Sequence, residues 1–247
     1  MQARFGLIGY PLGHSFSQAY FTDKFHQEGV TASYTNFPLP SLEAVDRLRN
    51  MPGLIGLNVT IPYKEQIMPL LDRIDDSARA VGAVNTILCG EGWIGYNTDI
   101  EGVRGTLAGW LPSTVTSALI LGTGGAARAV RYVLKQLNIH TSMVSRSVGK
   151  GNLTYAQLDA GVLAQHVLIV NTTPLGTFPA VDRCPDLPYH FLGPDHYLFD
   201  LVYNPEKTLF LKRGEEHGAH IQNGLQMLHI QADRAWEIWK PHLKTGT

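Results

Sequence analysis

The sequence has little of several features that would commit a chain to a particular class of protein. Its 247 residues include two cysteines, Cys89 and Cys184, and two thiols without a repeated spacing do not make a disulfide framework. They are expected to be reduced, structural cysteines of a cytosolic protein. Charged residues make up 17% of the chain and the formal net charge is −1, against roughly 25% charged residues in an ordinary soluble domain. Without a basic excess, neither nucleic acid nor an acidic membrane is an expected partner.

Long apolar runs and metal-ligand spacings are also missing. No segment approaches the about 18 consecutive apolar residues of a membrane span, and the N-terminal sequence lacks the apolar core and cleavage pattern of a secretory signal. The ten histidines show neither i, i+4 pairing nor clustering with cysteines, so no metal site is expected. These absences predict a cytoplasmic, enzyme-sized protein whose charge suggests no macromolecular partner.

What the chain does contain is an alternation of short apolar segments with helical ones. Strands are predicted at 4–9, 32–37, 54–60, 83–89, 93–97, 117–122, 140–146, 166–173 and 197–203. Helices are predicted at 17–29, 41–50, 67–82, 124–137, 153–159, 206–217 and 223–239, with one more within 99–116. The alternation is typical of parallel βαβ units, and the two segments on either side of Gly90-Glu91-Gly92 read as a hairpin. An α/β protein with a domain boundary near residue 100 is therefore expected.

A glycine-rich turn follows one of the predicted strands. In ALILGTGGAARAV (118–130), Gly122, Gly124 and Ala127 fit the pattern G-x-G-x-x-[G/A] between a strand and a helix. The two glycines permit a tight turn and close approach of a pyrophosphate, and the small alanine permits helix–strand packing. The helix start at Gly125 and Ala126 offers N–H groups to phosphates. We therefore interpret the turn as a dinucleotide-binding site; an ordinary tight turn is the structural alternative.

The end of the next strand indicates which dinucleotide. An acidic residue at this position would bind a ribose 2′-hydroxyl, but the chain has Ser145, Arg146, Ser147 and Lys150, with no acid before Asp159. A guanidinium suits a 2′-phosphate. NADP is thus favoured over NAD, the alternative being that Arg146 is merely an exposed arginine at a strand end.

Further polar motifs occur in both halves of the chain. They are GYPLGHSFS (9–17), GLNVTIPYK (56–64), GAVNT (82–86), GYNTD (95–99), NTTPLG (171–176), DLVYNP (200–205) and NGLQMLHIQA (223–232). Taken singly, their residues have ordinary explanations as a solvated lysine, helix caps or turn formers. Lys64 would be the solvated lysine. The helix caps would be Ser15, Ser17 and Asp99, and the turn formers would be Asn85 and Asn97.

Taken together and in this order, the motifs resemble the shikimate dehydrogenase family over nearly the whole chain. The resemblance implies NADP-linked, reversible reduction of 3-dehydroshikimate to shikimate, in aromatic amino-acid and chorismate biosynthesis. It also implies an N-terminal α/β substrate-binding and catalytic domain (1–100) and a Rossmann-type NADP-binding domain (101–222). The C-terminal helices (223–247) would pack back on the first domain. A monomer or homodimer is expected.

Carried over residue by residue, the resemblance implies that Lys64 and Asp99 are the catalytic pair. The implied substrate-binding residues are Ser15, Ser17, Thr60, Asn85, Tyr203 and Gln231. The implied cofactor-binding residues are Gly122, Gly124, Gly125, Ala126, Ser145, Arg146, Thr172, Val202 and Gly224. Such a set matches a chemical need, because a polyhydroxy acid requires several fixed hydrogen-bond partners. Reduction of a ketone also requires a proton donor at the developing alkoxide.

The chain departs from the family pattern in two places. Family members often have proline and a His-Asn pair where this chain has Gln18 to Phe21, and Asn-Arg where it has Ser145-Arg146. An NAD-linked quinate/shikimate dehydrogenase is the nearest alternative, and both Arg146 and Ser17, which is threonine in some quinate-active relatives, argue against it. A non-catalytic metabolite-binding relative would be expected to lack Lys64 or Asp99, and both are present.

Overall fold

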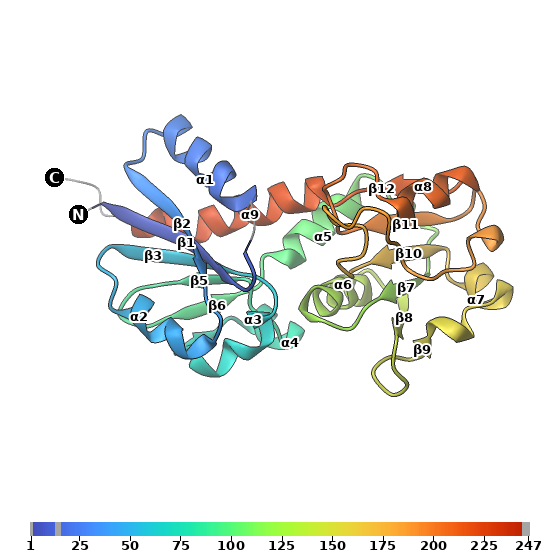
Figure 1. The fold of residues 1–247 in the computed structure, drawn as a ribbon, viewed down its shortest axis with the longest axis horizontal. Coiled ribbons are helices and arrows are strands. Elements are labelled where there is room, and N and C mark those ends of the chain that lie inside the picture. Colours follow the sequence, from blue (N-terminus) through green and yellow to red (C-terminus); the bar gives the residue numbers. More distant parts are fainter. Residues whose placement is uncertain (1, 13–15, 244–247) are drawn as a thin grey trace. The chain divides into compact units, whose positions relative to one another are not determined.

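The computed structural model describes residues 2–12 and 16–243 (Figure 1). The chain divides into two compact units. Unit 1 consists of 1–98 and 232–247, and unit 2 consists of 99–231. The second division falls inside the long helix α9 (Leu225–Trp239), so the chain returns to unit 1 at Ala232 and not at residue 223. Among the described helices, none has both the length and the apolar character needed to cross a bilayer.

Unit 1 is built on a mixed six-stranded sheet with the order β2-β1-β3-β5-β6-β4. Its strands are β1 (Ala3–Gly9), β2 (Ala32–Pro38), β3 (Leu54–Val59), β4 (Arg73–Ile74), β5 (Thr86–Leu88) and β6 (Ile94–Tyr96). Strand β1 runs parallel to both of its neighbours, β2 and β3, since helical crossovers connect these strands along the chain. β5 and β6 pair antiparallel, which confirms the predicted hairpin.

The two faces of this sheet are covered by different helices, as the alternation of side chains along β1 requires. Phe5 and Leu7 point into a cluster with α1 (Phe16–Gln27) and the C-terminal half of α9. The neighbouring Ile8 points into a second cluster with η1, α2, α3 and α4. These helices span Leu42–Val45, Asp46–Arg49, Tyr63–Gln66 and Asp76–Val81, respectively.

Aromatic side chains fix the last helix in unit 1. Trp239 is fully buried, lies 5.2 Å from the Phe5 ring and 5.3 Å from the Phe21 ring, and donates its indole N–H to the carbonyl of Ile87 at 2.9 Å. A Cβ on Gly56 would lie 2.3 Å from the indole. Gly56 thus leaves the space that Trp239 fills.

Two helix predictions in unit 1 were wrong in form. The segment 67–82 is broken into a 3-10 turn η2 (Met68–Leu70), strand β4 and helix α4. It breaks because β4 pairs with β6, and because Asp75 accepts a hydrogen bond from the N–H of Ser77 and so begins a new helix. The segment 41–50 is likewise a 3-10 turn followed by the short α2.

Unit 2 is built on a fully parallel six-stranded sheet with the order β12-β11-β10-β7-β8-β9. Its strands are β7 (Ser117–Leu121), β8 (His140–Ser145), β9 (Leu153–Thr154), β10 (Leu168–Asn171), β11 (Tyr197–Asp200) and β12 (His220–Gln222). Counted from β7, this is the 3-2-1-4-5-6 order of a dinucleotide-binding Rossmann domain. The predicted Rossmann-type domain is confirmed.

The helices of unit 2 are α5 (Asp99–Ala108), α6 (Gly125–Gln136), α7 (Ala160–Gln165), α8 (Leu209–Glu216) and the first part of α9. Helix α6 contacts β7 and β8, α8 contacts β11 and β12, and α5 packs on α6. On α6, Ala127, Val130 and Leu134 are fully buried, and this spacing turns one apolar stripe toward β7 and β8. The helix predicted at 153–159 is instead β9 with a 3-10 turn, and α7 follows, begun by Asp159 accepting from Val162.

Candidate active site

The glycine-rich turn lies at the switch point of the unit 2 sheet. The chain leaves β7 toward β8 on one side, and β10 lies on the other side, which is where open α/β sheets bind their ligands. Gly122 has φ of 117°, and a Cβ there would lie 2.5 Å from the Thr172 hydroxyl. Thr172 donates from both its N–H (3.0 Å) and its hydroxyl (2.6 Å) to the carbonyl of Leu121. The loop after β10 therefore closes directly over the turn.

The start of α6 is open to a ligand. Gly124 is the N-cap, supplies no side chain to the first turn, and has nothing within 4 Å of the place where its Cβ would be. No side-chain cap therefore competes for the N–H groups that follow at Gly125 and Ala126. An uncapped helix start beside a glycine turn fits a pyrophosphate.

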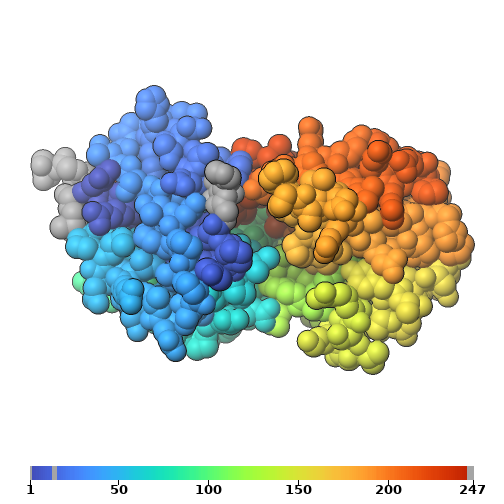
Figure 2. Space-filling view, in the orientation of Figure 1, coloured from blue at the N-terminus to red at the C-terminus, as the bar shows by residue number. Residues whose placement is uncertain are grey.

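The end of β8 presents cationic side chains to solvent. Ser145 is buried, and its hydroxyl accepts a hydrogen bond from the N–H of Ser147 at 3.1 Å, which shapes the turn. Arg146, Val148 and Lys150 follow on an exposed loop, drawn in yellow-green at the molecular surface in Figure 2. An exposed guanidinium in this position fits a 2′-phosphate.

The predicted residues Val202 and Gly224 are joined to each other. The N–H of Gly224 donates to the carbonyl of Val202 at 3.1 Å. A Cβ on Gly224 would lie 2.1 Å from the carbonyl oxygen of Leu201, so a larger residue would push these two loops apart. Val202 and Gly224 follow β11 and β12, and together with Thr172 they occupy three adjacent strand ends.

Three further predicted residues also belong to unit 2. Asp99 is buried and is the first residue of α5. Tyr203 is half-buried, and burial raises the pKa of its phenol. Gln231 lies on α9, where its side-chain amide donates to the carbonyl of Leu228 at 2.9 Å.

In unit 1, Thr60 and Lys64 follow the carboxyl end of β3. The N–H of Thr60 donates to the carbonyl of Ile8 (2.9 Å), and its own carbonyl accepts from the N–H of Tyr63 (2.9 Å), which starts α3. Lys64 is half-buried on α3, and its carbonyl accepts the N–H of Val84 at 2.7 Å. Lys64 is therefore fixed beside the segment that carries Asn85.

Asn85 is buried at the centre of a polar network. Its Oδ1 accepts the N–H of Thr98 at 2.7 Å, and its Nδ2 donates to the Thr98 hydroxyl at 3.0 Å. Its backbone carbonyl accepts the N–H of Val59 at 2.8 Å. Asn85 therefore positions Thr98, which immediately precedes Asp99 in the chain, and one of its amide hydrogens is used for this.

Two residues beside this polar network, Tyr34 and Asn58, are not among the site residues predicted from the sequence. Tyr34 is buried in β2 and donates its hydroxyl to Oδ1 of Asn58 in β3 at 2.7 Å. Burial raises the pKa of Tyr34, and the nearby Ser17 side chain lowers it in part. Ser17 therefore lies near the Tyr34 phenol, whereas Ser15 lies outside the described residues. Asn58 stands within GLNVT, but its partner was not evident, because Tyr34 belongs to a different segment.

The stretch that departs from the family pattern lies in the first turns of α1. Phe21 is fully buried and stacks on Tyr34, with ring centroids 4.8 Å apart. The side chain of Gln18 accepts from the amide of Asn36 at 3.1 Å. This helix is therefore anchored to β2 by an aromatic stack and an amide pair.

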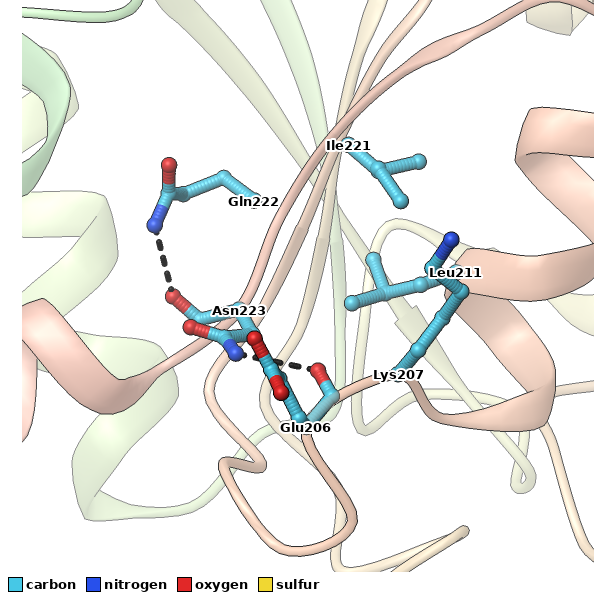
Figure 3. Close-up of a pocket in the computed structure, with 6 residues that line it drawn as sticks. All are labelled: Glu206, Lys207, Leu211, Ile221, Gln222 and Asn223. Atoms are coloured by element: carbon cyan, nitrogen blue, oxygen red, sulfur yellow. Dashed lines mark hydrogen bonds between the residues drawn. The ribbon is translucent and has the colours of Figure 1, made fainter.

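A surface hollow elsewhere in unit 2 does not coincide with these residues. Figure 3 shows this hollow, of about 500 Å³, lined by Glu206, Lys207, Leu211, Ile221, Gln222 and Asn223. Inside it, the amide of Asn223 donates to the carbonyl of Glu206 at 2.9 Å. Within the described ranges, no three His, Cys, Asp or Glu side chains gather in a way that could hold a metal ion.

The sheet order, the glycine turn at the switch point and a separate α/β unit with a polar strand edge define a two-domain dinucleotide-binding protein. The family model of the shikimate dehydrogenase substrate-binding domain matches residues 7–87. Shikimate dehydrogenase (NADP(+)) of Desulforamulus reducens is 36% identical over 95% of this chain and 88% of its own length. The chain belongs to the shikimate dehydrogenase family.

Solved structures agree with this assignment. The shikimate dehydrogenase of Aquifex aeolicus is 32% identical and superposes with a TM-score of 0.87 over 99% of this chain and 94% of its own. The enzyme of Thermus thermophilus, in complex with NADP(H) and shikimate, is 30% identical, with a TM-score of 0.86 over 97% of this chain and 94% of its own.

Proposed function

We propose that this protein catalyses the NADP-linked, reversible reduction of 3-dehydroshikimate to shikimate, a step of aromatic amino-acid and chorismate biosynthesis. The observation that carries the proposal is the glycine turn at the switch point of a 3-2-1-4-5-6 sheet. It occurs in a chain that matches NADP-linked shikimate dehydrogenases over 95% of its length. Unit 1 would hold the substrate, and unit 2 the cofactor.

The residues that would hold NADP lie along one edge of the unit 2 sheet. Gly122, Gly124, Gly125 and Ala126 suit the pyrophosphate, and Ser145 and Arg146 suit the 2′-phosphate. Thr172, Val202 and Gly224 would line the nicotinamide end. When bound, NADPH supplies a hydride to the ketone carbon, and NADP⁺ accepts one in the reverse direction.

The substrate would be held by side chains that donate or accept hydrogen bonds. In this proposal, Ser15, Ser17, Thr60, Asn85, Tyr203 and Gln231 bind the carboxylate and hydroxyl groups. Asn85 is buried and held by its bonds to Thr98, so it would present a fixed amide to a substrate hydroxyl. Losing such a partner would leave a buried hydroxyl unsatisfied, which makes this kind of site selective.

Lys64 and Asp99 would carry the proton chemistry. In the reducing direction, the Lys64 ammonium donates a proton to the oxygen as negative charge develops there, and in the oxidising direction the neutral amine accepts it. Asp99 would be the second member of the catalytic pair. Asn85 supports this arrangement, since it fixes Thr98, the residue before Asp99.

A direct assay tests the proposal. The purified protein is mixed with shikimate and NADP⁺, and formation of NADPH is followed by absorbance; quinate with NAD⁺ is the comparison. We expect turnover with the first pair and much slower turnover with the second. Absence of NADPH formation from shikimate by correctly folded protein would refute the proposed function.

Two finer expectations go with this function. The protein would work in the cytoplasm, where such a biosynthetic step finds its substrates, and it would be a monomer or a homodimer. Light scattering on the eluting protein measures the mass directly, and a mass above twice 27.2 kDa would contradict the second expectation.

A further inference from the structure

Asp200 is a buried carboxylate to which the mechanism above gives no role. It is the last residue of β11 and has no exposed surface, and neither have its partners Asn171 and Thr208. Its Oδ1 accepts the amide of Asn171 at 2.9 Å and the N–H of Val202 at 3.0 Å. Its Oδ2 accepts the hydroxyl of Thr208 at 2.5 Å. Burying an acid is unfavourable unless its hydrogen bonds are satisfied, and here three donors from three segments converge on it.

Each of these bonds leads to a strand-end loop. The other end of the Asn171 amide, Oδ1, accepts both the N–H (3.0 Å) and the hydroxyl (2.7 Å) of Thr173, in the loop after β10. Because the Thr173 N–H can only donate, it fixes which way the Asn171 amide points. Asp200 therefore reaches the loop that carries Thr172 through one intermediate side chain.

The hydrogen bond from the N–H of Val202 connects Asp200 to the loops after β11 and β12. Val202 receives the carboxylate at its N–H, and its carbonyl accepts the N–H of Gly224 at 3.1 Å. The Cβ position of Gly224 is closed by the carbonyl of Leu201. The loops after β11 and β12 are therefore fixed relative to each other and to Asp200. The third bond reaches Thr208, whose side chain caps α8.

We propose that Asp200 is a positioning residue that holds the loops after β10, β11 and β12 in the arrangement needed at the nicotinamide end of the cofactor. The inference rests on the proposed function, which places Thr172, Val202 and Gly224 at that end. Asp200 itself touches neither substrate nor cofactor in this account. It acts through Asn171, Val202 and Thr208, and the loop after β8 with Arg146 is outside its reach.

The test compares Asp200→Ala, Asp200→Asn and a control, Asp159→Ala. Asp159 is also an acid of unit 2 with a structural bond, to the N–H of Val162 at 2.8 Å, but it has no link to the three loops. In the free protein, amide hydrogen exchange at Val202 and Thr173 should become at least about 10-fold faster in Asp200→Ala, since both depend on this carboxylate. Asp200→Asn, which keeps an acceptor oxygen, should restore slow exchange.

The kinetic readout separates positioning from stability. Displaced loops should lower kcat by about 10- to 100-fold in Asp200→Ala, while the preference for NADP over NAD stays unchanged. Asp200→Asn should recover most of kcat, and Asp159→Ala should keep the wild-type kcat. Asp200→Ala with wild-type exchange and wild-type kcat would overturn the proposal. So would a loss of thermal stability in both alanine variants with kcat unaffected.

A second variant covers the case in which Asp200→Ala does not fold. Asn171→Ser is too short to join Asp200 to Thr173 but leaves the bond to Val202. Exchange at Thr173 should rise, exchange at Val202 should stay slow, and kcat should fall. Unchanged exchange at Thr173 and unchanged kcat would overturn the proposal. If the wild-type protein shows no NADP-linked oxidation of shikimate, the proposed function fails, whereas the exchange data still report on Asp200.

Discussion

The buried Asp200 should make the stability of the protein depend on pH in an unusual direction. Burial raises the pKa of this carboxyl from its ordinary 3.8 to about 7, while the hydrogen bonds from Thr208, Val202 and Asn171 lower it in part. The unfolded chain keeps the ordinary value. The folded state therefore binds the proton more tightly than the unfolded state, so the contribution of Asp200 to the free energy of unfolding is most favourable below pH 4. This contribution is lost progressively as the pH rises through about 7.

The size of the effect follows from the difference in pKa. Each unit of pKa corresponds to 1.36 kcal/mol, so the interval from 3.8 to about 7 corresponds to about 4 kcal/mol in the free energy of unfolding. Asp200→Asn removes the titrating group, keeps the shape, and lets the Thr208 hydroxyl turn to accept a bond. We expect this variant to gain at least about 2 kcal/mol relative to wild type between pH 5 and pH 8.5.

Urea unfolding of both proteins across this pH range measures the effect. The difference between variant and wild type is the quantity to follow, because it cancels the other titrating groups. Thr208→Val serves as the opposite control, because it removes a bond that lowers the pKa of Asp200. The pH range over which this variant loses the stabilising contribution of protonated Asp200 should therefore lie higher than in wild type. A stability difference between Asp200→Asn and wild type that does not vary with pH would show that Asp200 does not titrate with a raised pKa.

Three further predictions concern the candidate site. Arg146→Ala should raise KM for NADP by about 10- to 100-fold, since a charge-assisted contact is lost, and leave KM for NAD nearly unchanged; equal effects on both cofactors would contradict the assignment. Gly224→Ala should lower the thermal midpoint and weaken NADPH binding, measured by fluorescence titration, because its Cβ would lie 2.1 Å from a backbone oxygen; wild-type values for both would show that the loops yield freely. Asp99→Asn should lower kcat about as much as Lys64→Ala, and the double variant should be far less than multiplicatively worse; multiplicative losses in steady-state kinetics would mean independent roles.

The parts of the fold that local sequence could predict are those with strong local patterns. β7, the glycine turn and α6 combine an apolar run, a G-x-G-x-x-A spacing and an amphipathic helix, and all three are found. β12 was missed because three residues, His-Ile-Gln, carry no usable periodicity. The segment 67–82 was misread because pairing of β4 with β6 overrides its helical pattern.

The candidate site divides in the same way. Thr60, Lys64 and Asn85 stand in motifs that can be read from the sequence, whereas Tyr34 reaches Asn58 from β2 across β1, in a register that no local pattern contains. Asp200 is the first residue of the motif DLVYNP, but its three hydrogen bonds depend on Asn171 and Thr208, which reach it only in the folded chain. Long-range hydrogen bonds of this kind arise only from the tertiary structure.

Substitution of Lys64 tests whether this protein oxidises shikimate with NADP⁺ by general acid–base catalysis. Initial rates of NADPH formation should be measured for wild type and for Lys64→Ala, with shikimate varied and folding of both confirmed by thermal unfolding. We expect clear activity in wild type and a fall in kcat of about 10² to 10⁴-fold in the variant, the range for removing a general acid–base group. KM should change far less, because a general acid–base group acts mainly in the transition state. A variant with wild-type kcat would show that Lys64 has no catalytic role, and a folded wild type without activity would overturn the proposed function.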